Sequence, residues 1–228
     1  MNQDELTIVP LFQIGPVVIT STIVTTWAII VLLGAVSWAT TRNLKLEPGR
    51  VQTAVEGIVA TIETAVDEVA QRHTREILPF IGTLWIYLVI ANLTGLIPGA
   101  SSPTRDLSAT AALAFLVFLS THWFGIRTQG LRRYLKHYLT PSPVLLPFHL
   151  VSEVTRTVAL AVRLFGNMMS LEMAALLILL VAGFLVPVPL LMLHIVEALV
   201  QAYIFGMLAL IYVIGGVQSQ EMKEESQE

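Results

Sequence analysis

Long uncharged stretches alternate with short charged ones along the chain, and this pattern predicts a helical membrane protein. No Asp, Glu, Lys or Arg occurs in residues 6–41, 77–104 or 107–126. A helix that spans a bilayer needs about 20 mostly apolar residues. We therefore expect an external tail over residues 1–16, a first membrane span over 17–41 and a membrane hairpin over 77–126.

Residues 50–74 show a different pattern, in which apolar residues recur at helical spacing and polar residues occupy the rest of the helix. This spacing predicts an amphipathic helix on the cytoplasmic surface of the membrane. The polar side of this helix is acidic, so anionic lipid headgroups would not retain it. We expect a partner chain or the neighbouring spans to hold it. The apolar positions are Val51, Val55, Ile58, Ile62, Val66 and Val69.

The last third of the chain reads as two long helices that meet at Pro187-Val-Pro189. We assign residues 140–216 to this helix pair and residues 217–228 to a solvated, acidic cytoplasmic tail. The predicted fold class is an all-α integral membrane protein. It has about five membrane helices and one amphipathic surface helix, and the last two long helices form a hairpin.

The distribution of Lys and Arg predicts the orientation of the chain. Five of these residues lie between the first and second spans, at positions 42, 45, 50, 72 and 75, and four follow the third span, at 127, 132, 133 and 136. Cytoplasmic loops carry the excess of Lys and Arg. We therefore expect a multi-pass protein with its N-terminus outside and its C-terminus in the cytoplasm. The acidic start of the chain lacks the basic region of a cleaved signal peptide, so the first span should be an uncleaved anchor.

Composition narrows the functional classes. Only 13% of the 228 residues are charged, compared with about 25% in soluble domains. The net charge of −3 argues against nucleic acid as a partner, and the absence of cysteine excludes thiolate chemistry. The five histidines lie in separate segments, and no nucleotide-binding loop or paired-His spacing is present. We therefore expect no catalytic residue, no cofactor and no metal site.

Arg163 is the most informative residue, because it lies in a stretch that is otherwise apolar enough to enter lipid. Arginine keeps its charge on burial, and placing it at the membrane centre costs about 2.5–3.5 kcal/mol on insertion scales. The default interpretation is a pathway for ions or charged groups. A buried structural pair of Arg163 with Glu172 or Glu197 is the alternative.

Two polar stripes accompany this arginine. At 100° per residue, Arg163, Asn167 and Ser170 share one helix face, with Glu172 roughly opposite. On the last helix His194, Glu197 and Gln201 align. Ala198, Ala202 and Gly206 form a strip of small residues that permits close packing. Such stripes are typical of a proton or cation route.

Structural roles are the alternative for several of these residues. Glu172 and His194 could only hold two helices together, and Arg156 could extend to the headgroups. We interpret Asn92 as structural.

The run Arg163-Leu-Phe-Gly-Asn-Met168 resembles a motif of subunit a of the rotary F-type ATP synthases, the membrane stator that faces the ring of c subunits. The resemblance covers residues 17–216 and includes Asn92-Leu-Thr-Gly-Leu-Ile-Pro98 and His194…Gln201-Ala-Tyr-Ile-Phe205. The short N-terminal tail and residues 137–147 resemble the N-type branch, which is thought to include sodium-linked enzymes. Gly95 stands where some members carry an acidic residue.

The resemblance implies a role for each matching residue. Arg163 corresponds to the essential stator arginine, Asn167 and Gln201 to the polar residues near it, and Glu172 and His194 to the pair that lines the outer half-channel. Glu197 adds a carboxylate. Glu153 and Ser170 are candidates for the inner half-channel, although the family's usual glutamate stands at another distance from the arginine. The implied partners are the c-ring, b-type peripheral stalk subunits, membrane lipid and, indirectly, the F1 head, in a bacterial inner membrane.

The implied function is a stator with two half-channels that moves H⁺ or Na⁺ against the c-ring and makes no bond itself. Both ions remain open, because the residues of this chain do not fix the choice. An ion-coupled secondary transporter, in which Arg163 would bind an anionic substrate at the midplane, is the second hypothesis. A purely structural assembly subunit that docks a partner through residues 50–73 is the third.

Overall fold

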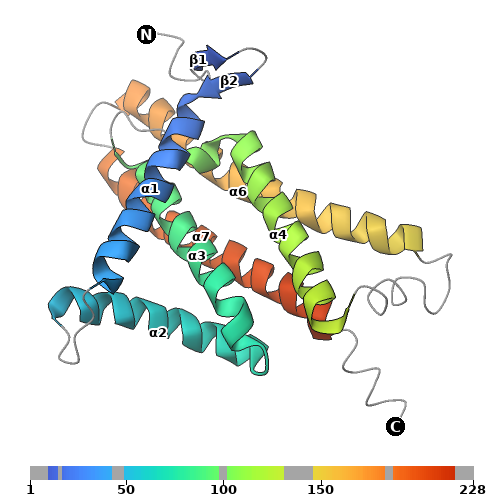
Figure 1. Cartoon of the computed structure of the whole chain (residues 1–228). Helices are drawn as coiled ribbons and strands as arrows, with labels where there is room; N and C mark the ends of the chain where they lie inside the picture. The colour runs from blue at the N-terminus through green and yellow to red at the C-terminus, as the bar shows by residue number, and fades with distance from the viewer. Residues whose placement is uncertain are drawn as a thin grey trace.

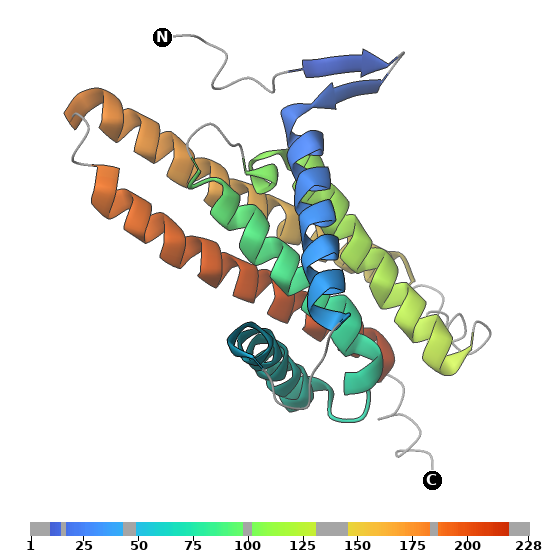
Figure 2. The same cartoon turned by 60° about the vertical axis from the view of Figure 1, so that its left-hand side comes forward.

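The computed structural model describes residues 10–14, 17–42, 49–97, 102–130, 146–182 and 187–218, apart from some side chains within these ranges. Its long helices are α1 (Ser21–Thr41), α2 (Arg50–Ala70), α3 (Thr74–Thr94), α4 (Leu107–Gln129), α6 (Leu146–Ala182) and α7 (Pro187–Gln218), with a 3₁₀ turn, η2 (Pro103–Arg105), before α4. Helices α6 and α7 run side by side and cross the direction of α1 (Figures 1 and 2).

A small antiparallel hairpin of β1 (Pro10–Ile14) and β2 (Val17–Thr20) precedes α1. The prediction that residues 17–41 form one helix is therefore wrong at its start, because helix α1 begins only at Ser21. The run Val17-Val-Ile-Thr20 consists of β-branched residues, which favour strands. The hairpin lies at the opposite end of the molecule from α2 (Figure 1).

The predicted class, an all-α integral membrane protein, is confirmed outside this hairpin. Within the described part of the chain, four helices are long and apolar enough to cross a membrane, α1, α3, α4 and α7. Helix α6, the remaining predicted span, packs against α4, α7 and η2. Of the tail predicted over residues 1–16 the structure describes residues 10–14, which form β1, and of the tail predicted over 217–228 it describes residues 217–218, which end α7.

Helix α2 is the predicted amphipathic helix, and it makes contact with the bundle mainly through its C-terminal end. Val66 and Ala70 are buried against α3 and α7, whereas Val51 and Ile58 remain exposed. The N-terminal part of α2 therefore extends away from the bundle, as Figure 1 shows. This exposed apolar row agrees with the expectation that something outside the described contacts covers it.

The core forms where α3, α4 and α7 meet. Ile81, Leu88, Phe205, Leu210 and Val213 are almost wholly buried there. The predicted strip of small residues on α7 faces this core, since Ala198 and Ala202 are fully buried and Gly206 is buried too. Small side chains let two helix backbones approach closely. The predicted close packing of α7 is therefore confirmed.

Gly206 provides a test of this packing. A methyl group at Gly206 would overlap the indole ring of Trp85 on α3, whereas one at Gly215 would meet nothing in the described part of the chain. We expect Gly206→Ala to destabilise the subunit by about 1–3 kcal/mol, the usual cost of overpacking. Gly215→Ala should be neutral or stabilising by up to about 1 kcal/mol.

The measurement is the temperature at which the detergent-solubilised complex loses this subunit, together with its amount in the membrane. Equal thermal behaviour of the two variants would show that the Trp85–Gly206 contact does not limit stability.

Candidate functional site

Two side chains of α3 position α7. Asn92 Nδ2 donates to the carbonyl oxygen of Ala198 at 3.1 Å, and Trp85 Nε1 donates to that of Tyr203 at 3.3 Å. The indole of Trp85 also stacks on the Tyr203 ring, with 5.9 Å between centroids. A carbonyl oxygen has two lone pairs, so each can accept these bonds in addition to a helical one. These contacts fix the rotation of α7 relative to α3. They thereby fix the direction of the polar row of α7, which consists of His194, Glu197 and Gln201.

Asn92 is itself held by the loop after α3. The Thr104 hydroxyl donates to Asn92 Oδ1 at 2.9 Å, and the Ser102 hydroxyl, 2.7 Å from that of Thr104, donates to the Ala91 carbonyl. Asn92 and Thr104 are fully buried. A buried amide with both ends hydrogen-bonded is a structural element. The interpretation of Asn92 as structural agrees with these contacts.

Helices α6 and α7 are joined by a direct hydrogen bond between two predicted site residues. Asn167 Nδ2 donates to Gln201 Oε1 at 2.6 Å. Gln201 is buried and Asn167 half-buried. The structure therefore brings together two residues that lie 34 positions apart in the sequence.

Arg163 lies one turn before Asn167 on α6, and its side chain is exposed. Within the described part of the chain, Arg163 forms no hydrogen bond or ion pair. The structural pair of Arg163 with Glu197 is thus not formed among these residues, and the side chain of Glu172 lies outside them. Exposed apolar side chains lie on the adjacent face of α6, at Val158, Val162 and Met169, whereas the exposed Arg156 and Ser170 share the face of Arg163.

On α7, His194 and Gln201 are buried and Glu197 is half-buried. In the structure described, His194 Nε2 and Gln201 Nε2 are buried without a hydrogen-bond partner. Buried polar atoms normally have a hydrogen-bond partner. We therefore expect each of these nitrogens to bind a water molecule or another group. The predicted contact between His194 and Glu172, which would hold the two helices together, stays a prediction because the Glu172 side chain is not described.

The remaining candidates on α6 separate into two places. Ser170 is exposed, beyond Asn167. Glu153, near the start of α6, faces His122 of α4, with Nε2 and Oε2 3.6 Å apart. The guanidinium of Arg156 lies over the Tyr212 ring at 4.1 Å from its centroid. It therefore packs against α7 through a cation–π contact. Sequence patterns did not single out His122, since only the fold brings it to Glu153.

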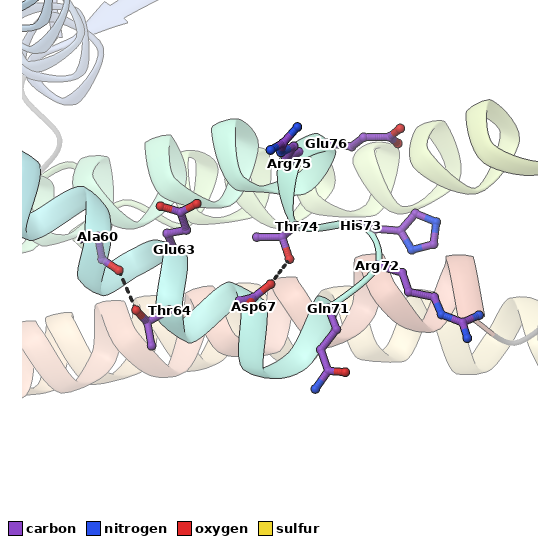
Figure 3. Close-up of a pocket in the computed structure, with 10 residues that line it drawn as sticks. All are labelled: Ala60, Glu63, Thr64, Asp67, Gln71, Arg72, His73, Thr74, Arg75 and Glu76. Atoms are coloured by element: carbon purple, nitrogen blue, oxygen red, sulfur yellow. Dashed lines mark hydrogen bonds between the residues drawn. The ribbon is translucent and has the colours of Figure 1, made fainter.

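An open cavity of about 700 Å³ lies elsewhere, at the turn between α2 and α3 (Figure 3). Asp67 on α2 accepts a hydrogen bond of 2.7 Å from Thr74 on α3 there, and this bond ties the two helices together. The lining mixes acidic and basic residues, Glu63 and Glu76 with Arg72 and Arg75. None of the predicted ion-translocation residues lines it, so this cavity is separate from the Arg163 region.

This arrangement suits ion transport more than bond chemistry. It combines an exposed cation beside apolar side chains on α6 with the buried polar residues His194 and Gln201 on the neighbouring helix. Among the described residues, no group of three or more His, Asp or Glu side chains could hold a metal ion.

The comparisons with known proteins decide the family. The profile described as "ATP synthase A chain" matches residues 22–214. The chain belongs to the ATP synthase subunit a family. It is 62% identical over 218 residues to "ATP synthase subunit a 2" of Pelobacter propionicus, which covers 96% of both chains. It is 65% identical to "ATP synthase subunit a 1" of Hahella chejuensis, over 90% of this chain and 88% of that one. It is 55% identical to "ATP synthase subunit a" of Legionella pneumophila, over 95% and 94%.

Membership of this family confirms the resemblance seen in the sequence. The chain is the stator component of the ion-translocating F0 sector, and the secondary-transporter hypothesis has no support. It works as one subunit of a larger complex and is a multi-pass protein of the bacterial inner membrane. The roles of individual residues, the orientation of the termini and the N-type branch stay predictions.

The Asn167–Gln201 bond leads to a stability prediction. Asn167→Leu should leave the buried Gln201 amide without its partner and cost about 1–3 kcal/mol. Replacing both residues by Leu removes both polar groups, so the double variant should recover most of that loss. Ser170→Ala, at an exposed position of the same helix, serves as the control and should change nothing.

Thermal unfolding of the purified complex measures this effect. A double variant that is no more stable than Asn167→Leu would argue that the bond contributes nothing to the α6–α7 contact.

Proposed function

We propose that this subunit moves ions between two half-channels that meet at Arg163, where a carboxylate of the c-ring is forced to ionise. One observation carries the proposal. Arg163 is exposed, it has no hydrogen-bond or ion-pair partner among the described residues, and exposed apolar side chains lie on the adjacent face of α6, at Val158 and Val162. A permanent cation in a membrane needs a counter-charge, and we assign that charge to the rotor carboxylate.

The neighbourhood of Arg163 supports a close-fitting partner. A Cβ atom at Gly166 would meet no atom of the described chain, so packing within this subunit does not require glycine there. Gly166 lies three residues from Arg163, on the same side of the helix. An absent side chain beside the guanidinium gives a passing rotor helix room to approach it.

The mechanism follows from charge. A rotor carboxylate crosses lipid only in a neutral form, protonated or paired with a cation. Near Arg163 the fixed positive charge favours the ionised carboxylate and lowers its affinity for the ion. The ion then leaves through one half-channel, and another ion is loaded from the other. Arg163 also repels mobile cations and so prevents a direct leak. Each charge moved gains about 2.3 kcal/mol per 100 mV.

The buried row on α7 supports the outer half-channel. His194 and Gln201 each have a buried nitrogen without a partner in the described structure, and water is the ligand that satisfies such atoms. With Glu172 and Glu197 they would form the outer route, and Glu153 with Ser170 the inner one. By the positive-inside rule the N-terminus lies outside and the C-terminus in the cytoplasm. The b-type stalk subunits and lipid cover the exposed apolar faces.

We expect Arg163→Ala to abolish ATP-driven ion pumping while the complex still assembles, because nothing then drives the rotor carboxylate to release its ion. The measurement is ATP-driven acidification of inside-out vesicles in sodium-free buffer. Arg156→Ala is the matched control, an exposed arginine on the same helix that packs on Tyr212, and it should keep pumping. Coupled pumping retained by Arg163→Ala would end the proposal.

The same assay addresses the coupling ion. If wild-type vesicles acidify without sodium, the ion is H⁺. If they do not acidify and sodium restores ATP turnover, the ion is Na⁺, as the N-type resemblance suggests.

We also expect Glu172→Gln and His194→Ala to slow transport without stopping it, because water in the half-channel can bypass one missing group. The initial pumping rate and its pH dependence, compared with the wild type, test this. If either variant leaves both quantities unchanged, that residue does not belong to the outer half-channel.

A further inference from the structure

A second ionisable site lies apart from Arg163 and the polar row of α7, where α4 meets α6. His122 Nε2 and Glu153 Oε2 are 3.6 Å apart, and their side chains are 27% and 19% exposed. Both groups are held by the protein, yet some of each side chain remains accessible. Such a site can exchange protons with water without being fully solvated.

The backbone fixes which nitrogen of His122 is available. His122 Nδ1 lies 2.9 Å from the carbonyl oxygen of Phe118. A carbonyl oxygen only accepts, so Nδ1 carries the hydrogen and donates it. The Phe118 ring packs against the imidazole, with 4.3 Å between centroids. Nε2 is therefore the atom that gains or loses a proton, and it faces Glu153.

This geometry can hold one proton between the two groups. A neutral Nε2 and an ionised carboxylate are both hydrogen-bond acceptors, so they have no proton to share and do not attract each other. They attract when one proton is added, either as imidazolium beside carboxylate or as imidazole beside carboxylic acid.

We propose that His122 and Glu153 form a proton-exchange site at the mouth of the inner half-channel, with His122 Nε2 as its exchanging atom. The inference rests on the proposed function and adds His122 to it. In one direction the pair takes a proton from hydronium in the cytoplasm, leaves a water molecule behind, and passes the proton to water on the side of Arg163. In the other direction the same steps reverse, and the pair returns to its starting state.

The position of the pair fits this role. Glu153 precedes Arg163 by ten residues on α6, which is about 15 Å along the helix axis. The pair is therefore separated from Arg163 along α6, towards the N-terminal end of that helix. It lies near the end of α4 and the start of α6, whose connecting segment is basic and predicted to be cytoplasmic.

Few other ionisable groups stand on the helices packed around the pair. His149 and Arg156 flank Glu153 on α6, and Arg127 follows His122 on α4. In the described part of α7, no acidic or basic residue follows Glu197, and Arg156 is directed at the Tyr212 ring. No acidic side chain among the described α7 residues after Glu197 can therefore compete for a proton held between His122 and Glu153.

The key variant is His122→Gln, because glutamine can still donate a hydrogen bond to Glu153 but cannot take up a proton. The measurement is passive proton conduction by vesicles stripped of the catalytic head, driven by a potassium diffusion potential and normalised to assembled complex. We expect conduction to fall about tenfold or more, since a positioned acid–base group contributes about 10²–10⁴-fold to proton-transfer steps. Glu153→Gln should show a similar loss, and Glu153→Asp should retain most of the conduction.

His73→Gln and Glu68→Gln are the matched controls, since they make the same changes near α2, and they should conduct like the wild type. His122→Gln that conducts at the wild-type rate would overturn the proposal and leave the pair as a tie between helices. Equal conduction by Glu153→Asp and Glu153→Gln would overturn it too, as would wild-type vesicles that conduct sodium but not protons. Failure of the proposed role of Arg163 is a separate outcome, because it would be seen as ATP-driven pumping retained by Arg163→Ala.

Discussion

The contact between α3 and α7 is the constraint on which the rest of this structure depends. Two side chains of α3, Asn92 and Trp85, donate to backbone carbonyl oxygens of α7, and small residues on α7 let the two helices approach. A polar side chain in a membrane core is costly unless it is hydrogen-bonded. These bonds therefore fix both the rotation and the height of α7, and with them the position of His194 and Gln201.

The orientation of α6 follows from α7. The hydrogen bond between Asn167 and Gln201 sets which side of α6 faces its neighbour. Arg163, one turn away, is then exposed beside apolar side chains of α6. In the proposed mechanism, a carboxylate of the rotor supplies the charge opposite to this cation. The fold thus prepares Arg163 for a partner and leaves the counter-charge to it.

In the proposed mechanism, the two ends of the transport route use different chemical groups. On α7 the buried nitrogens of His194 and Gln201 have no protein partner in the described structure, and water would satisfy them there. Between α4 and α6, His122 and Glu153 complement each other through a shared proton. Arg163 stands between these two regions along α6 and α7. A fixed charge at the centre, with proton-exchanging groups towards each side, can load and unload a rotor without a continuous leak.

The sequence by itself determined the membrane class, the amphipathic helix, the hairpin of α6 and α7, and the family. An uncharged run of about 20 apolar residues favours a membrane helix, and the cost of an arginine in such a run predicts a functional role for Arg163. The β1–β2 hairpin was missed because Val17-Val-Ile-Thr20 is as apolar as the helix that follows it. Residue spacing also gave the faces of Arg163, Asn167 and Gln201, because helical periodicity is a local property. Only the tertiary structure decided that Asn167 meets Gln201, that Asn92 holds α7 and that His122 faces Glu153, because contacts between distant helices depend on how their surfaces pack.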